Sequence, residues 1–98
     1  MEKEVEKYYN KGLDALDDGN WLLAVQHFRK CLDVDPAFIT ARHELADIYF
    51  NNKQYEAALA EIKQALTVEP DDPEASFALG NIYMAQGRHK DEIGRAHV

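Results

Sequence analysis

The chain is poor in cysteine, in long apolar runs and in basic residues, and each shortage excludes a class of protein. Cys31 is the only cysteine in 98 residues, so no internal disulfide can form. No apolar run approaches the roughly 18 residues that a membrane-spanning helix needs. Met1 is followed at once by the charged residues Glu2-Lys3-Glu4, and not by an apolar leader segment. We therefore expect a cytoplasmic protein without membrane contact.

Basic residues are outnumbered by acidic ones. The chain has 11 Lys and Arg against 18 Asp and Glu, which gives a formal net charge of −7 with neutral histidines. A nucleic-acid binder needs clustered Lys and Arg to neutralise phosphates, so we expect no nucleic-acid partner. An acidic surface keeps a small protein soluble and favours basic partners.

Residues that could carry chemistry stand alone. The four histidines are His27, His43, His89 and His97, and none has the helical spacing with a supporting carboxylate that marks a zinc site. The glycines stand singly, so there is no glycine-rich loop for a phosphate. We therefore expect no enzyme, no metal site and no cofactor, and we expect the histidines to lie on the surface.

A repeat of 34 residues organises what remains. Residues this far apart match in size, small with small and aromatic with aromatic or branched. The pairs are Trp21 with Tyr55, Ala24 with Ala58, Phe28 with Ile62, Cys31 with Ala65, Pro36 with Pro70, Ala41 with Ala75, Leu45 with Leu79 and Tyr49 with Tyr83. The matches predict that Cys31 is packed and inert, and that Trp21 packs and does not stack on a ligand.

Within each unit the apolar residues recur at helical spacing, and turn-forming residues separate the units. Breaks are expected at Gly19-Asn20 and Asn51-Asn52-Lys53 inside the pairs of helices, and at Pro36 and Pro70-Asp71-Asp72-Pro73 between them. The pattern predicts helices over about 2–17, 21–34, 38–51, 55–68 and 73–86.

A helix-turn-helix unit of this length, with the pattern W-x2-L-G-x2-Y…A-x3-F…P, resembles the tetratricopeptide repeat family. The resemblance covers residues 5–91, as repeats over about 5–38, 39–72 and a truncated 73–91. It implies an all-α fold of antiparallel helical hairpins, stacked as a short right-handed α-solenoid of about two and a half repeats. The residues that carry it are Tyr8, Gly12, Ala24, Phe28, Pro36, Leu45, Ala46, Tyr49, Ala58, Ile62, Pro70, Leu79, Gly80 and Tyr83. The small ones among them, such as Gly12 and Gly80, are expected to let the two helices of a hairpin approach closely.

The last seven residues depart from the repeat. Glu92 stands where a small residue is expected, 34 positions after Ala58. The segment 92–98, which reads EIGRAHV, resembles the in-frame translation of a sequencing adapter that ends on its stop codon. Our hypothesis is that 92–98 is a non-native tail and that the natural protein continues past Asp91; the alternative is a genuine divergent terminus.

In tetratricopeptide repeat proteins the first helix of each hairpin lines a concave groove that holds a peptide. Carried onto this sequence, that geometry implies an acidic, aromatic-containing groove. Its predicted residues are Tyr9, Asn10, Leu13, Asp17, His43, Glu44, Asp47, Asn51, Phe77, Asn81 and Met84. Such a mixture suits a basic and hydrophobic peptide. The alternative is a solvated inner face that more of the same array covers.

One use of the family is expected to be absent. Members that grip the carboxylate of chaperone tails place Lys, Asn and Arg at groove positions that correspond here to Tyr9, Leu13, Glu44, Glu74 and Phe77. Because Glu44 and Glu74 would repel a carboxylate, we expect no clamp of this kind.

Three functions remain open from the sequence. The first is a scaffold for protein–protein interactions. The second is the repeat arm of a larger enzyme or of a secretion or assembly protein. The third is a structural module that self-associates, as a homo-oligomer, through the uncapped helix 73–86, whose apolar residues are too many for a finished cap.

Overall fold

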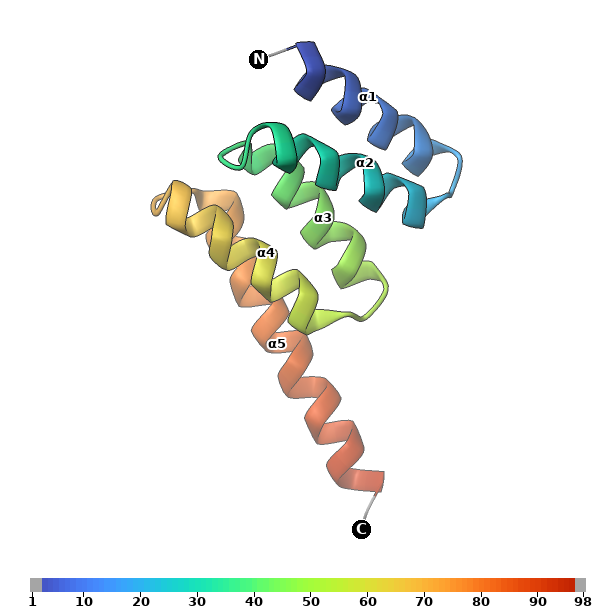
Figure 1. Ribbon diagram of the computed structural model, residues 1–98. Helices are drawn as coiled ribbons and strands as arrows, with labels where there is room; N and C mark the ends of the chain where they lie inside the picture. The colour runs from blue at the N-terminus through green and yellow to red at the C-terminus, as the bar shows by residue number, and fades with distance from the viewer. Residues whose placement is uncertain (1–2, 97–98) are drawn as a thin grey trace.

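The protein is a stack of antiparallel helices in a computed structural model that describes the backbone of residues 3–96 and the side chains of residues 3–88. The helices follow one another down the stack in chain order (Figure 1). They are α1 (Lys3–Asp17), α2 (Trp21–Val34), α3 (Ile39–Asn51), α4 (Tyr55–Val68) and α5 (Pro73–Ala96). The predicted all-α, tetratricopeptide-like fold is confirmed, and the first four helices match their predicted bounds to within one residue.

The two hairpins turn where the sequence predicts. Gly19 has a φ of 76° and Lys53 a φ of 61°, and a left-handed residue of this kind is how many helices end. The Asn20 side chain then accepts a hydrogen bond of 3.2 Å from the Leu23 amide at the start of α2. Asp72 caps α5 in a similar way, because its carboxylate accepts from the Glu74 amide at 3.2 Å.

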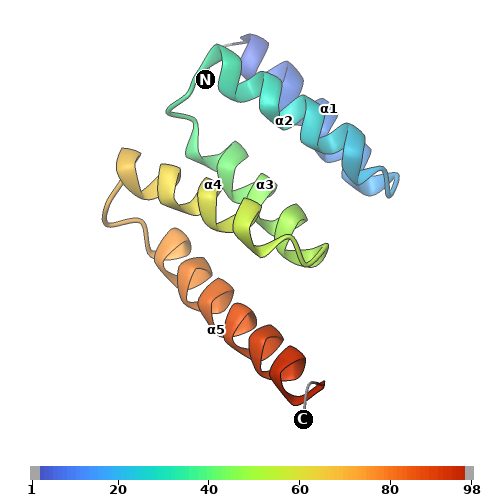
Figure 2. The same ribbon diagram turned by 60° about the horizontal axis from the view of Figure 1, so that its bottom comes forward.

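The core lies in two parts that follow the stacking. The first part joins α1, α2 and α3, and the second joins α3, α4 and α5. Figure 2 shows the resulting layers: the α1–α2 hairpin, the α3–α4 hairpin and then α5. We call the contact of the two hairpins the first junction, and the contact of the second hairpin with α5 the second junction.

The matched residues Gly12 and Gly80, at the two ends of the stack, have different surroundings. A Cβ atom added at Gly12 would lie 2.5 Å from the ring of Phe28, which is fully buried. Gly12 thus lets α1 and α2 approach, as predicted. The matched Gly80 has no heavy atom within 4 Å of the same point, so the predicted close approach is wrong there. No helix of the described part of the chain covers that face of α5.

The fifth helix is longer than predicted. The sequence predicts an end near 86, before Gly87, but α5 continues to Ala96. Gly87 matches Gly19 and Lys53, the two residues with positive φ, yet here it lies inside a helix. One helical glycine costs only about 1 kcal/mol relative to alanine, which does not by itself force a turn. The predicted tail at 92–98 lies outside the residues whose side chains are described, so its origin stays a hypothesis.

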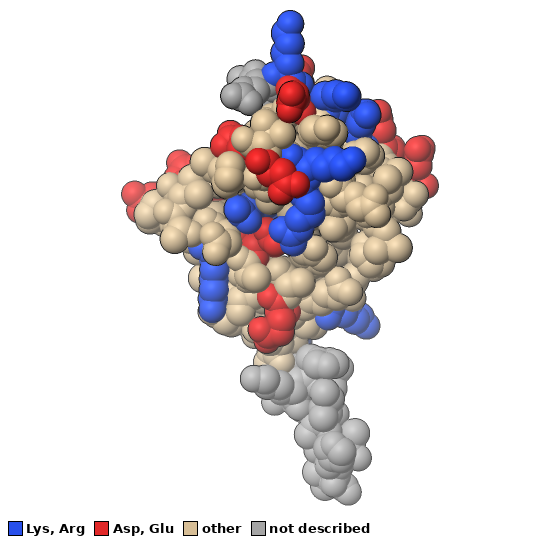
Figure 3. All heavy atoms as spheres, in the orientation of Figure 1, with Lys and Arg blue, Asp and Glu red and all other residues tan. Residues whose placement is uncertain are grey.

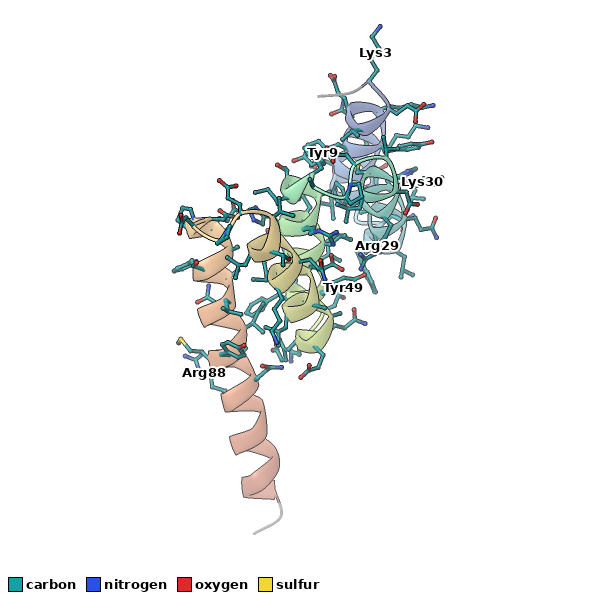
Figure 4. The ribbon with its side chains drawn as sticks, turned by 60° about the vertical axis from the view of Figure 1, so that its left-hand side comes forward. Lys3, Tyr9, Arg29, Lys30, Tyr49 and Arg88 are labelled. Carbon is teal, nitrogen blue, oxygen red and sulfur yellow. The ribbon has the colours of Figure 1, made fainter. Side chains whose placement is uncertain are left out.

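A buried carboxylate locks the first junction. The Glu61 side chain of α4, 7% exposed, forms ion pairs with Arg29 of α2 and with Arg42 of α3 at 3.1 Å. Arg29 also donates a hydrogen bond of 3.0 Å to the Tyr49 hydroxyl, and the two side chains meet between the hairpins (Figure 4). Arg42 reaches the carbonyl oxygen of Pro36 at 3.2 Å. These contacts join three helices across the junction.

Candidate peptide-binding face

The first helices of the repeats, α1, α3 and α5, are linked by side-chain contacts along one side of the molecule. Tyr9 of α1 contacts Glu44 of α3, and His43 of α3 contacts Glu74 of α5. We call the surface that these three helices present the first-helix face. All the predicted groove residues lie on these three helices, because the prediction took them from the first helix of each repeat.

At the first junction, aromatic and apolar side chains fill the first-helix face. The Tyr9 ring packs against Phe28 and Phe38, with ring centroids 5.7 and 5.6 Å away, and its hydroxyl donates to Glu44 Oε1 at 3.5 Å. Leu13 packs half-buried against the core below. Figure 4 shows Tyr9 between α1 and the beginning of α3. This part of the face is closed by the protein's own side chains.

Three carboxylates from α3 and α5 share one region of the face. Burial, then the negative charge of Asp47, raises the pKa of Glu44 above its ordinary value of 4.5, and the hydrogen bond from Tyr9 opposes the shift. Burial, then the charge of Glu74, raises the pKa of Asp47 above its ordinary value of 3.8. Within the described residues no Lys or Arg pairs with these groups, so a cation brought from outside would stabilise all three.

The sequence predicts His43 on the surface, and this prediction is wrong. The side chain connects α3 to the start of α5. It is 11% exposed, with Nε2 2.6 Å from the buried Asp72 and Nδ1 3.1 Å from Glu74. A neutral ring carries one N–H, so both contacts are hydrogen bonds only when the ring is protonated. His27 is half-buried too, and burial, then the charges of Lys30 and Lys11, lowers its pKa. Both rings lie on helix faces that turn toward a neighbouring helix.

The second junction contains a pocket on the first-helix face. It has a volume of about 60 Å³ and is lined by residues of α3 and α5: Ala46, Asp47, Phe50, Ala78, Asn81 and Ile82. Asp47 and Asn81 supply its polar atoms, and the other four side chains are apolar. Two predicted groove residues, Asp47 and Asn81, are therefore brought together at one small cavity.

Large apolar side chains stand out into solvent on α5. Phe77 is 73% exposed, Met84 57% and Tyr83 50%. Exposed aromatic and methionine side chains of this size are typical of contact surfaces. Phe77 and Met84 were predicted for the groove, and their exposure leaves both free to contact a partner.

The other predicted groove residues are less engaged. Asn10, Asp17 and Asn51 are exposed and make no hydrogen bond or ion pair within the part of the chain that the structure describes. Asp17 and Asn51 are the last residues of α1 and α3, so they lie at the border of the face. The structure does not gather them with Glu44 and Asp47.

The sequence reasoning missed the apolar lining of the pocket, above all Phe50. A signal was present: 34 positions after Glu44 the chain has Ala78, so a long side chain is replaced by a methyl group. Loss of volume at a matched position indicates a hollow. It also missed Glu61, whose charge on α4 gave no sign of burial before its two arginine partners were placed.

Acidic and basic side chains lie interspersed on the face seen in Figure 3. In residues 3–88 no three His, Cys, Asp or Glu side chains are placed to hold a metal ion. Cys31 is buried, and its thiol contacts the carbonyl oxygen of Val5 at 3.5 Å, while burial raises its pKa. The described helices include none that is long and apolar enough to cross a membrane.

Comparison with known proteins gives the same assignment. A family model described as "Tetratricopeptide repeat" matches residues 15–66, and one described as "TPR repeat" matches residues 46–87. The chain is 33% identical over 96 residues to the photosystem I assembly protein Ycf3 of Synechococcus sp. (strain CC9311), covering 95% of this chain and 56% of the relative. It is 34% identical over 96 residues to the protein of the same name from Prochlorococcus marinus (strain NATL1A), with the same coverage of 95% and 56%. The chain thus spans little more than half the length of these relatives.

Proposed function

Because the chain belongs to the tetratricopeptide repeat family, we propose that it is a scaffold which binds a basic and hydrophobic segment of a partner protein on its first-helix face. The observation that carries this proposal is the group of Glu44, Asp47 and Glu74, carboxylates without a Lys or Arg partner in the described residues. Their mutual repulsion and partial burial contribute to the raised pKa values of Glu44 and Asp47. A cationic side chain placed among them would remove that repulsion.

Apolar contacts would supply the rest of the affinity. Phe77 and Met84 stand exposed on α5, next to the acidic region that Glu74 begins. A segment that alternates basic and apolar residues can reach both at once. The arrangement also argues against a clamp for terminal carboxylates, because Glu44 and Glu74 occupy two of its five positions and would repel the ligand.

The relatives are named for the assembly of photosystem I, and by analogy we propose an assembly role for this chain. A scaffold that holds a flexible segment of an unassembled subunit needs no catalytic group, so the proposed role is not that of an enzyme. The similarity to these proteins leaves the partner open, because repeat scaffolds of one fold serve unrelated roles.

Short peptides of four compositions test the proposal: basic and apolar, acidic and apolar, basic without apolar residues, and uncharged. Fluorescence anisotropy should show tightest binding for the basic and apolar class. Glu44→Lys and Asp47→Lys should each weaken it at least about tenfold, which corresponds to about 1.4 kcal/mol. Asp33→Lys is the matched control, since Asp33 is exposed on α2 and the substitution changes the charge by the same amount. Equal binding by the acidic class, or equal loss in the control, would refute the proposal.

A second candidate is self-association through α5. The exposure of Phe77, Tyr83 and Met84 and the open position at Gly80 favour it. Sedimentation at increasing concentration tests this candidate, and Tyr83→Lys should return the protein to a monomer. A monomer at every concentration would exclude it.

A further inference from the structure

The pocket at the second junction is lined by four apolar and two polar residues. Ala46, Phe50, Ala78 and Ile82 provide carbon atoms, and Asp47 and Asn81 provide oxygen atoms. Asp47 brings a carboxylate to the pocket, and the side chain of Ile82 on α5 is buried. A side chain that fits such a pocket has an apolar stem and a positively charged end.

The size of the pocket limits that side chain to a few atoms. A cavity needs about 10–15 Å³ for each probe-sized occupant. The volume of about 60 Å³ therefore holds about four to six such occupants. The lysine side chain beyond its Cβ atom has three methylene groups and one ammonium group, which is a chain of that length. The planar guanidinium group of arginine is wider and holds its five donors in a rigid fork, whereas lysine ends in one compact charge on a flexible stem.

Two of the positions that line the pocket, Asp47 and Ala78, differ in size and charge from their counterparts at the first junction. At the first junction the residues that correspond to Asp47 and Ala78 are Leu13 and Glu44. Leu13 packs on the core, and Glu44 lies under the hydroxyl of Tyr9. In the second junction an alanine leaves the space open, and an aspartate takes the place of the leucine. Volume is thus removed, and the single carboxylate moves from the second helix of the junction to the first.

We propose that this pocket takes a lysine side chain of the partner, with its methylene groups against Phe50, Ala78 and Ile82 and its ammonium group at Asp47 and Asn81. The proposal rests on the proposed function, and it names the anchor of the bound segment. The raised pKa of Asp47 supports it, because a neighbouring ammonium group would reverse the effect of burial and of the charge of Glu74. Methionine or norleucine would fill the space but would leave the Asp47 carboxylate without a counter-charge.

Small probes test the pocket without any knowledge of the partner. Butylammonium has the atoms of a lysine side chain, 1-butanol has the same length without the charge, and butyrate has the opposite charge. Each is titrated into isotope-labelled protein, and amide shifts are followed by NMR. We expect butylammonium to bind at millimolar concentration with the largest shifts at Asp47, Phe50, Ala78 and Asn81. We expect 1-butanol to bind at least about threefold more weakly, and butyrate not to shift these amides.

Two variants and one control locate the binding. Ala78→Leu fills the pocket and should abolish the shifts. Asp47→Asn keeps the shape and should bring butylammonium down to the level of 1-butanol. Ala60→Leu adds the same atoms at an exposed position of α4 and should leave the binding unchanged. Equal shifts with butylammonium and 1-butanol, or shifts that persist in both pocket variants, would overturn the proposal.

The same pocket is then tested in a peptide. In a basic and apolar peptide that binds, each lysine is replaced in turn by norleucine, arginine or acetyl-lysine. One lysine should be sensitive to all three changes, with a loss of about tenfold, and this sensitivity should disappear in Ala78→Leu. If peptides bind through Glu44 but no lysine behaves in this way, the pocket proposal fails and the proposed function stands. If butylammonium binds as expected but no peptide class is preferred, the proposed function fails.

Discussion

The two junctions of the stack use the same repeat positions and differ in what fills them. At the first junction, Arg29, Glu61 and Arg42 form a buried ionic contact, and Tyr9 closes the first-helix face over Glu44. At the second junction, Lys63 and Ser76 stand where the two arginines would be, and both are exposed. A pocket lies on its first-helix face.

This difference separates two tasks that the repeat must perform. The first junction fixes one hairpin on the next, because three helices share one buried carboxylate that is costly to leave unpaired. The second junction holds α5 through His43 and its partners Asp72 and Glu74, and through apolar packing. Among the described residues, it leaves the carboxylate of Asp47 without a Lys or Arg partner beside an open pocket. The ion pairs that join the hairpins are thus concentrated at the first junction, and the open pocket lies at the second.

The largest expected effect comes from Glu61→Gln. The change leaves Arg42, whose side chain is 14% exposed, without its charged partner. Loss of one partner from a buried ion pair costs about 3–5 kcal/mol, and we expect about 3 kcal/mol because Arg29 is partly exposed. Urea unfolding measures the free energy. Glu69→Gln is the control, since Glu69 is exposed and should change the stability by less than about 0.5 kcal/mol. A loss below about 1 kcal/mol for Glu61→Gln would show that the first junction is not locked by this group.

The matched glycines should respond with opposite sign. Gly12→Ala places a Cβ atom 2.5 Å from the buried Phe28 ring, and overpacking of this kind costs about 1–3 kcal/mol. Gly80→Ala places the same atom in open space, so only the higher helix propensity of alanine remains, a gain of up to about 1 kcal/mol. Thermal and urea unfolding of both variants give the comparison. Destabilisation by Gly80→Ala would mean that something packs on that face of α5 in solution.

The fold could be predicted from the sequence because the same packing positions occur in two successive repeats. Trp21 and Tyr55 open their helices, and Ala24 and Ala58 are fully buried, as the matched positions predict. Packing at a repeated interface depends on residue size, and size is visible in one sequence. Where none of the described helices packs on the position, as at Gly80, the same rule gave a wrong expectation.

The site was harder to predict, since it depends on how two repeats differ. The sequence located Asp47 and Asn81 on the first-helix face, but it gave no sign that they meet at a pocket. It placed His43 on the surface, whereas two carboxylates at the beginning of α5, Asp72 and Glu74, hold its ring. Contacts of this kind need the position of one helix relative to the next. Repeat matching alone does not supply it.

The acidic region should make cation binding depend on pH. Glu44 and Asp47 have raised pKa values, so in the folded protein they take up protons at higher pH than free carboxyl groups do. Affinity for a basic and apolar peptide should therefore fall as the pH is lowered from neutral toward the ordinary pKa values of these groups, 4.5 for Glu44 and 3.8 for Asp47. The unliganded protein should change the other way. It binds more protons than the unfolded chain in this window, so these two groups make it more stable as the pH falls.

Anisotropy titrations at several pH values check the binding half of this prediction. The double variant Glu44→Gln with Asp47→Asn is the control, and its weaker affinity should vary little over the same range. A wild-type affinity that does not depend on pH would mean that the peptide binds away from these carboxylates. The difference between the two junctions would then have no bearing on binding.

The smallest effect is expected where the first junction is closed by Tyr9. Its hydroxyl donates to Glu44 over 3.5 Å, at the outer limit for a hydrogen bond, so Tyr9→Phe should cost no more than about 0.5 kcal/mol of stability. The hydrogen bond lowers the pKa of Glu44, so its loss should move that pKa further upward. NMR titration of the Glu44 carboxyl group measures the shift, with Tyr83→Phe on exposed α5 as the control. If the pKa of Glu44 did not move, Tyr9 would close the face by packing on Phe28 and Phe38 alone, and the carboxylate would be as free at the first junction as Asp47 is at the second.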